Sequence, residues 1–173
     1  MTNRFSFRRH DPPEAQITVS DAGTDVLISV LALAGSALAE TESQKRLIVW
    51  ISEHDRKIGA GTIGFCVADL PWDAASFEAD RQFMVRVCDE ASRHTGWETL
   101  PYTPNEKNLF PILGWFRKCF ARLKAEDTDP FQLADWLDDM EPDDPVLCGF
   151  PRCAQHGTLL TCLGCQVCHA GRP

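Results

Sequence analysis

Thiol and imidazole side chains gather in the stretch from Cys148 to His169 (CGFPRCAQHGTLLTCLGCQVCH). The stretch holds five of the chain's eight cysteines and two of its five histidines. Thiolate sulfur and imidazole nitrogen are the ligands that zinc prefers in structural sites. In a reducing compartment, clustered cysteines are better explained as metal ligands than as disulfides. The stretch therefore predicts a bound metal ion.

The spacing within this stretch defines two ligand pairs. Cys153 and His156 are separated by two residues, and so are Cys165 and Cys168. Such pairs let a tight turn wrap around the ion, and two pairs complete a tetrahedron. Gly157 directly follows the first pair and permits the positive φ that a metal-binding turn often needs there. The pattern over residues 146–170 resembles a zinc ribbon or zinc knuckle, which implies a small zinc-binding module. No family is recognised in residues 1–145.

Other ligand sets remain open. Cys148 and Cys162 are alternative ligands. The run Cys162-x2-Cys165-x2-Cys168 also matches the start of a ferredoxin motif, so an iron–sulfur cluster is a minor alternative. Because four protein ligands leave no position for water, we expect the metal to be structural zinc rather than a catalytic ion. Its role would be to fold a tail that is too short to build its own core.

Acidic side chains concentrate in residues 126–144, which hold nine Asp and Glu and no basic residue. The net charge of the chain is -8, so the other residues sum to about +1. A solvated helix face would explain this charge, and so would a contact surface for a basic partner. We take Asp135, Asp138 and Asp139 as the candidate partner surface. The same charge disfavours non-specific binding of nucleic acid there.

The rest of the chain predicts an α+β fold, in which a mostly helical domain with a two-stranded antiparallel hairpin precedes the zinc-ribbon-like module. We expect residues 1–16 to form a flexible arm, residues 17–140 the α+β domain, and residues 141–173 the linker and the zinc-binding module. Apolar residues at helical spacing predict helices at about 24–40, 74–94, 105–124 and 129–140.

The hairpin is predicted from two runs rich in β-branched residues, Arg46–Ser52 and Thr62–Ala68, joined by a polar connection that contains glycine. His54 lies in this connection between two carboxylates, and we expect it to be an ordinary loop histidine. Gly35 and Ser36, in the first predicted helix, are small enough to let another element approach closely.

These features favour a small cytoplasmic interaction or regulatory protein, an adaptor or an inhibitor such as an immunity protein. We expect no membrane span, because the apolar run at 26–38 is too short. We expect no signal peptide, because acidic residues and prolines separate this run from Arg4, Arg8 and Arg9.

Two other function classes are alternatives. A nucleic-acid-associated zinc-ribbon protein is less favoured, because the tail has few basic residues and no aromatic residue after Phe150. An uncharacterised enzyme is least favoured, because no set of nucleophile, base and orienting residue stands at a telling spacing.

Overall fold

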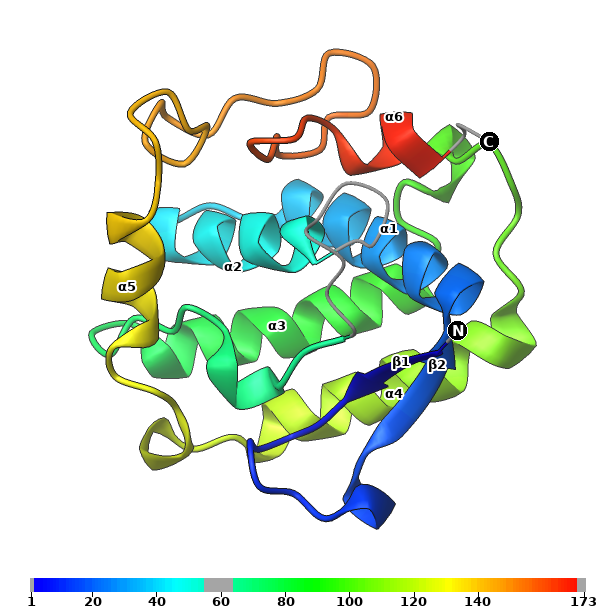
Figure 1. Cartoon of the computed structure of the whole chain (residues 1–173). Helices are drawn as coiled ribbons and strands as arrows, with labels where there is room; N and C mark the ends of the chain where they lie inside the picture. Colours follow the sequence, from blue (N-terminus) through cyan, green and yellow to red (C-terminus); the bar gives the residue numbers. More distant parts are fainter. Residues whose placement is uncertain (1, 55–63, 171–173) are drawn as a thin grey trace.

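Four helices form the centre of the computed structural model, which describes residues 2–54 and 64–170 (Figure 1). They are α1 (Asp21–Leu38), α2 (Glu42–Glu53), α3 (Phe77–Ser92) and α4 (Glu106–Arg122). A hairpin of β1 (Thr2–Phe5) and β2 (Ile17–Ser20) lies at one side, and the short helices α5 (Gln132–Asp138) and α6 (Gln166–Ala170) follow α4. The mostly helical α+β class with one antiparallel hairpin is confirmed.

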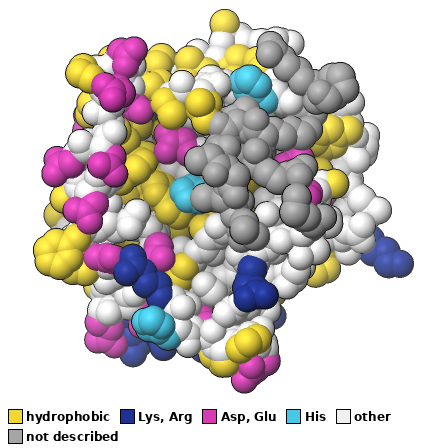
Figure 2. Space-filling model, in the orientation of Figure 1, with side chains coloured by type: hydrophobic (Ala, Val, Ile, Leu, Met, Phe, Trp, Pro, Cys, Tyr) yellow, Lys and Arg dark blue, Asp and Glu magenta, His cyan; other side chains and the backbone are white. Residues whose placement is uncertain are grey.

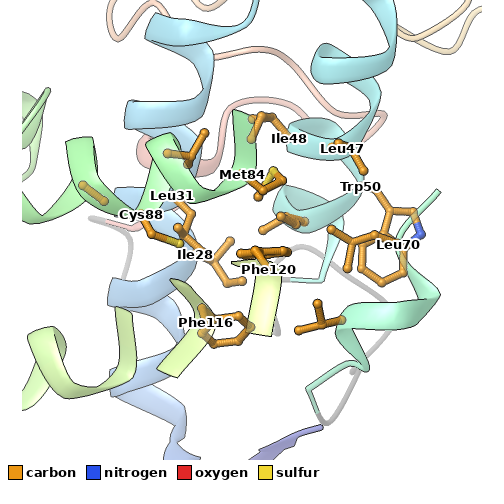
Figure 3. Close-up of a cluster of buried hydrophobic side chains, with 14 of the residues drawn as sticks. Ile28, Leu31, Leu47, Ile48, Trp50, Leu70, Met84, Cys88, Phe116 and Phe120 are labelled. Atoms are coloured by element: carbon orange, nitrogen blue, oxygen red, sulfur yellow. The ribbon is translucent and has the colours of Figure 1, made fainter. Parts of the chain in front are cut away.

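Helix α1 is the central helix. Ser20 caps its first turn, where the Ser20 side chain accepts a hydrogen bond from Gly23 N–H at 3.1 Å. Its side chains pack against α2, α3 and α4, and Ile28 and Leu31 lie in the cluster drawn in Figure 3. By length and composition alone α1 would pass for a membrane span, but most of its residues are buried among the other helices.

Helix α2 replaces the first predicted strand, so the prediction for Arg46–Ser52 is wrong. Thr41 and Gln44 form a capping box: the Thr41 hydroxyl accepts from Gln44 N–H, and the Gln44 side chain accepts from Thr41 N–H. This signal starts a helix, and Leu47, Ile48 and Ile51 then fall on its buried face. Packing along this face outweighs the β-propensity of the branched residues.

The hairpin lies instead at the N-terminal end: β1 falls within residues 1–16, which we expected to be a flexible arm, and β2 follows directly after them. Strand β1 pairs with β2 in antiparallel register from Thr2–Ser20 to Phe5–Ile17. Phe5 is fully buried, with its ring 5.0 Å from that of Phe65 and 5.3 Å from that of Phe116. One large aromatic side chain thus ties the N-terminal segment to the core.

The second predicted strand, Thr62–Ala68, is also not a hairpin strand where the structure describes it. Cys66 makes one isolated parallel bridge with Ser6, and a 3-10 turn follows at Val67–Asp69. The predicted connection between the two strands lies largely outside the described residues.

The other predicted helices are confirmed with shifted ends. Helix α3 stops four residues before Gly96, which has a φ of +80°, and Asn105 is the residue at the N-cap position of α4. Helix α5 is shorter than predicted, since residues 130–131 form a turn before it.

Residues 141–170 cross over α1 and α2 and end in α6, as the orange and red segment of Figure 1 shows. Helix α6 contacts α1. This segment carries the predicted ligands.

Candidate metal centre

The four predicted ligands lie together. One donor atom from each of Cys153, His156, Cys165 and Cys168 falls within 4.8 Å of all the others. The Nδ1 atom of His156 is 3.5 Å from Cys153 Sγ, 3.5 Å from Cys165 Sγ and 3.3 Å from Cys168 Sγ. The sulfurs of Cys153 and Cys168 are 3.8 Å apart.

These distances match the edges of a zinc tetrahedron. With Zn–S of about 2.3 Å and Zn–N of about 2.05 Å, an ideal tetrahedron has S–S edges of about 3.8 Å and S–N edges of about 3.6 Å. The measured edges of 3.8 Å and 3.3–3.5 Å therefore leave room for one ion of this size at the centre. The residues present fit a tetrahedral metal ion.

The first ligand pair is held by a tight turn. Gly157 N–H donates to Cys153 O at 2.8 Å, and Cys153 N–H donates to Thr158 O at 2.8 Å. Gly157 has a φ of +68°, as its place after the ligand pair predicted. Burial raises the pKa of the Cys153 thiol, but hydrogen bonds from the backbone N–H groups of His156 and Gln155 and from the side chains of His156 and Cys165 together outweigh burial and lower the pKa to about 6. The turn thus favours a thiolate ligand.

The second pair lies at the start of α6. Cys165 precedes the helix and is buried, and its sulfur is 3.1 Å from the Thr158 hydroxyl and 3.4 Å from Cys168 N–H. Burial and the adjacent sulfurs of Cys165 and Cys153 raise the pKa of Cys168 to about 12. A divalent cation bound at this site would displace the thiol proton that Cys168 otherwise keeps. The hydrogen bonds to Cys165 are the kind of surrounding contact that orients metal ligands.

The backbone around the cluster is closer to a knuckle and helix than to a ribbon. Within residues 141–170 the strand-like pairing consists of two isolated bridges, Arg152–Leu159 and Thr161–Gly164. Because Cys165 and Cys168 belong to a helical start, they do not sit in a second β-turn of the ribbon type.

The module rests on α1. Leu33 packs against Cys165 and Val167 in a separate small apolar cluster. Two hydrogen bonds reach Ser36: Leu159 N–H donates to its hydroxyl at 2.9 Å, and the Arg152 guanidinium donates to its carbonyl oxygen at 2.6 Å. The expectation that Gly35 and Ser36 allow close approach is confirmed, since a Cβ on Gly35 would lie 2.2 Å from Ile48 Cδ1.

The alternative ligands make other contacts. The Cys148 thiol lies 3.8 Å from Pro142 O, and the Cys162 thiol lies 3.9 Å from Glu53 Oε1. Cys162 belongs to a second group of donors with Glu53 and Asp144, which sequence spacing could not reveal because the three residues are far apart in the chain.

The acidic segment divides into two parts. Arg8 pairs with Asp127 at 2.9 Å, and Arg9 pairs with Asp129 at 2.8 Å and with Asp69 at 2.7 Å. The basic N-terminal segment therefore neutralises the first part of the acidic run.

The predicted partner surface belongs to the second part. Asp135, Asp138 and Asp139 are exposed, and none of them has an ion-pair partner in the part of the chain that the structure describes. Figure 2 shows acidic side chains gathered on the face that carries α5.

His54 does not belong to either group of donors and is not an exposed loop residue. It caps the C-terminal end of α2, with its ring centroid 3.7 Å from that of Trp50 and its Nδ1 2.7 Å from Trp50 O. Burial lowers the pKa of His54, and the hydrogen bond to the Trp50 carbonyl partly opposes this. We therefore assign His54 a packing role.

Searches against protein-family models, curated proteins and solved structures find no significant match to this chain. The cluster itself is consistent with a zinc-binding motif.

Proposed function

We propose that this chain is a small interaction or regulatory protein, an adaptor or an inhibitor, whose acidic surface binds a basic protein partner. In this proposal the Cys/His cluster binds one structural zinc ion that folds the C-terminal module, and the protein acts in the cytoplasm. The observation that carries the proposal is the set of exposed carboxylates of Asp135, Asp138 and Asp139, which have no ion-pair partner among residues 2–54 and 64–170.

The position of these carboxylates supports a binding role. Asp138 is the last residue of α5 and Asp139 is its C-cap. The helix dipole disfavours negative charge at this end, at a cost of about 0.3–1 kcal/mol for each charge. The presence of carboxylates that destabilise the free protein is explained if they make favourable interactions with a partner in a complex. Phe131, 69% exposed at the other end of α5, offers an apolar contact beside them.

The zinc assignment is supported by the donor set. Three sulfurs and one nitrogen at tetrahedral separations suit zinc, and four protein ligands close the site to water. Purified protein should contain about one zinc ion per chain by metal analysis. Iron with a brown absorbance would instead identify an iron–sulfur cluster and overturn the zinc assignment.

A nucleic-acid role is less well supported by the contacts of the tail. Arg152 is one of its few basic groups, and it already donates to the carbonyl oxygens of Ser36 and Gly157. It is therefore committed to holding the module on α1 rather than to a phosphate.

The partner surface is tested by charge reversal with a matched control. One variant carries lysine at Asp135, Asp138 and Asp139, and the control carries lysine at three other exposed acidic residues, Glu14, Glu40 and Glu98. Both variants change the net charge by the same amount. The partner is identified by cross-linking and mass spectrometry in cells that produce the protein, and its affinity is then measured directly by calorimetry.

The surface variant should lose about 10–100-fold in affinity for a basic partner, while the control keeps its affinity within a factor of about 3. Equal losses in both variants would show a non-specific charge effect. A partner that binds the surface variant as tightly as the wild type would refute the proposed surface.

A further inference from the structure

A second group of metal-ligand types lies outside the Cys/His cluster. Four segments meet there around a pocket of about 580 Å³: the end of α2, the end of α5, the linker and the module. Its wall is strongly acidic and contains a thiol and an indole. The lining residues are Glu53, Trp136, Asp139, Met140, Glu141, Asp143, Asp144, Pro145 and Cys162. Among these lining residues five are carboxylates and none is basic.

Three donors converge in this pocket. One ligand atom from each of Glu53, Asp144 and Cys162 lies within 4.8 Å of the other two, and Cys162 Sγ is 3.9 Å from Glu53 Oε1. The separation expected for sulfur and oxygen on one tetrahedral zinc ion is about 3.6 Å. Cys162 is exposed, so a small rotation of its side chain closes the difference.

Asp144 is the fixed member of the group. Asp144 is only 7% exposed, and Val146 N–H donates a hydrogen bond to its Oδ1 atom at 2.9 Å. No donor reaches its other carboxylate oxygen within residues 2–54 and 64–170. Asp144 thus presents a carboxylate oxygen near a second carboxylate and a thiol, an arrangement that attracts a cation.

Burial also affects the protonation of Glu53. Burial raises the pKa of Glu53 to about 7, with the negative charge of Asp144 adding to the effect. The indole Nε1 of Trp136 donates to Glu53 Oε2 at 3.3 Å and only partly opposes it. The raised pKa favours the neutral acid in the metal-free protein, and among the lining residues no basic side chain offsets the acidic ones.

We propose that Glu53, Asp144 and Cys162 bind a second divalent cation of the zinc type (Zn²⁺, Co²⁺ or Cd²⁺). Two carboxylate oxygens and one thiolate suit a cation of intermediate softness, whereas Mg²⁺ and Ca²⁺ need a shell of oxygen donors. Binding releases the thiol proton of Cys162 to solvent, together with the carboxyl proton of Glu53 where that residue is protonated. Three protein ligands leave one coordination position, which opens into the pocket and can take a water molecule or a side chain of a partner.

The ion would join three parts of the chain. Glu53 ends α2, Asp144 lies in the linker, and Cys162 belongs to the module beside the first metal centre. An ion held by all three fixes the linker against the helical domain, close to the acidic surface on α5. The two sites differ in kind, since the Cys/His cluster is closed and this one is open.

The test counts metal ions in the full chain that already carries its Cys/His metal. The protein is equilibrated with a micromolar excess of Zn²⁺, and bound metal is measured after desalting. The same titration with Cd²⁺ is followed by the ultraviolet charge-transfer band that a thiolate–Cd²⁺ bond produces. The variants are Glu53→Gln and Cys162→Ser. Their matched controls are Asp135→Asn and Cys148→Ser, which change an exposed carboxylate and an exposed thiol outside the group.

We expect two equivalents of zinc in the wild type and in both controls, and one equivalent in Glu53→Gln and in Cys162→Ser. Loss of either ligand should weaken the second site by on the order of 100-fold or more, because even contacts around metal ligands are worth about 10–100-fold. The second increment of the Cd²⁺ band should disappear in Cys162→Ser and remain in Cys148→Ser. Retention of the first equivalent in every variant shows that the fold is intact.

Two results would overturn the proposal. One is a wild-type chain that never takes up more than one equivalent. The other is a second equivalent that survives both substitutions, which would place it on scattered surface carboxylates.

Discussion

The hydrogen bond between Leu159 N–H and the Ser36 hydroxyl gives the sharpest test of how the module is attached. Both residues are buried, and the bond is 2.9 Å long. Ser36→Ala would leave the Leu159 N–H buried without a partner, which costs about 1–3 kcal/mol. The chain also offers a matched control in Ser29, on the same helix. Ser29 is fully buried as well, but its hydroxyl has no hydrogen-bond partner within the described residues.

The two substitutions remove the same atom from α1 and gain the same helix propensity, about 0.5 kcal/mol. The difference between their free energies of unfolding therefore reports the hydrogen bond together with the smaller gain from removing the Ser29 hydroxyl. We expect Ser36→Ala to be less stable than Ser29→Ala by about 1–3 kcal/mol. Ser29→Ala should be as stable as the wild type or slightly more stable, because it removes an unsatisfied hydroxyl.

Urea unfolding of the metal-loaded protein gives the free energies, and amide hydrogen exchange locates the change. Exchange of the Leu159 amide should accelerate in Ser36→Ala and stay unchanged in Ser29→Ala. Equal stabilities of the two variants would refute the inferred attachment. An exchange rate of the Leu159 amide that is unchanged by Ser36→Ala would refute it as well.

Three further predictions concern the metal, the helix crossing and the pH dependence of stability. Cys165→Ser, or removal of the metal with a chelator, should expose the amides of residues 146–170 to exchange while α1–α4 stay protected; protection that persists would show that the module needs no metal. Gly35→Ala should destabilise the protein by about 1–3 kcal/mol, because its Cβ would overlap Ile48. Gly114→Ala has nothing within 4 Å of the new Cβ and should stabilise the protein by up to about 1 kcal/mol. Calorimetric melting compares the two variants, and equal effects would contradict the close packing at Gly35. In protein with metal only at the Cys/His site, the free energy of unfolding should fall as pH rises from 4.5 to about 7, because Glu53 holds its proton to higher pH in the folded chain than in the unfolded one. Glu53→Gln should remove about 1–3 kcal/mol of this fall. Parallel pH profiles of the two proteins would rule the effect out.

The metal ligands could be predicted from the sequence because each pair is a local feature. Two residues of spacing fix a turn, and the turn brings its two donors to one side of the chain. The helices with strong periodicity and clear ends were predictable for the same reason, as the stop of α3 before Gly96 illustrates. In each case the signal and the structure lie within a few residues of one another.

The hairpin could not be placed from the sequence, because the contacts that decide which segments form its strands are distant along the chain. Arg46–Ser52 has the composition of a strand, and only the capping box at Thr41 and Gln44 marks it as a helix. The strand β1 looks like an unremarkable polar terminus. Its order depends on Phe5 meeting Phe65 and Phe116, and no local pattern reports contacts over such separations. The group of Glu53, Asp144 and Cys162 was missed for the same reason.

The acidic segment shows how one run of charge can serve two purposes. Net charge and spacing describe residues 126–144 as a single patch. Yet Arg8 and Arg9 pair with its first part, whereas the aspartates of α5 and its C-cap have no ion-pair partner among the residues that the structure describes. A solvated helix face has no reason to place carboxylates at the end of a helix where the dipole opposes them. If those carboxylates serve binding, replacing Asp138 and Asp139 by lysine should strengthen the free protein slightly while weakening the complex. Stability and affinity would then change in opposite directions, which a purely structural role does not produce.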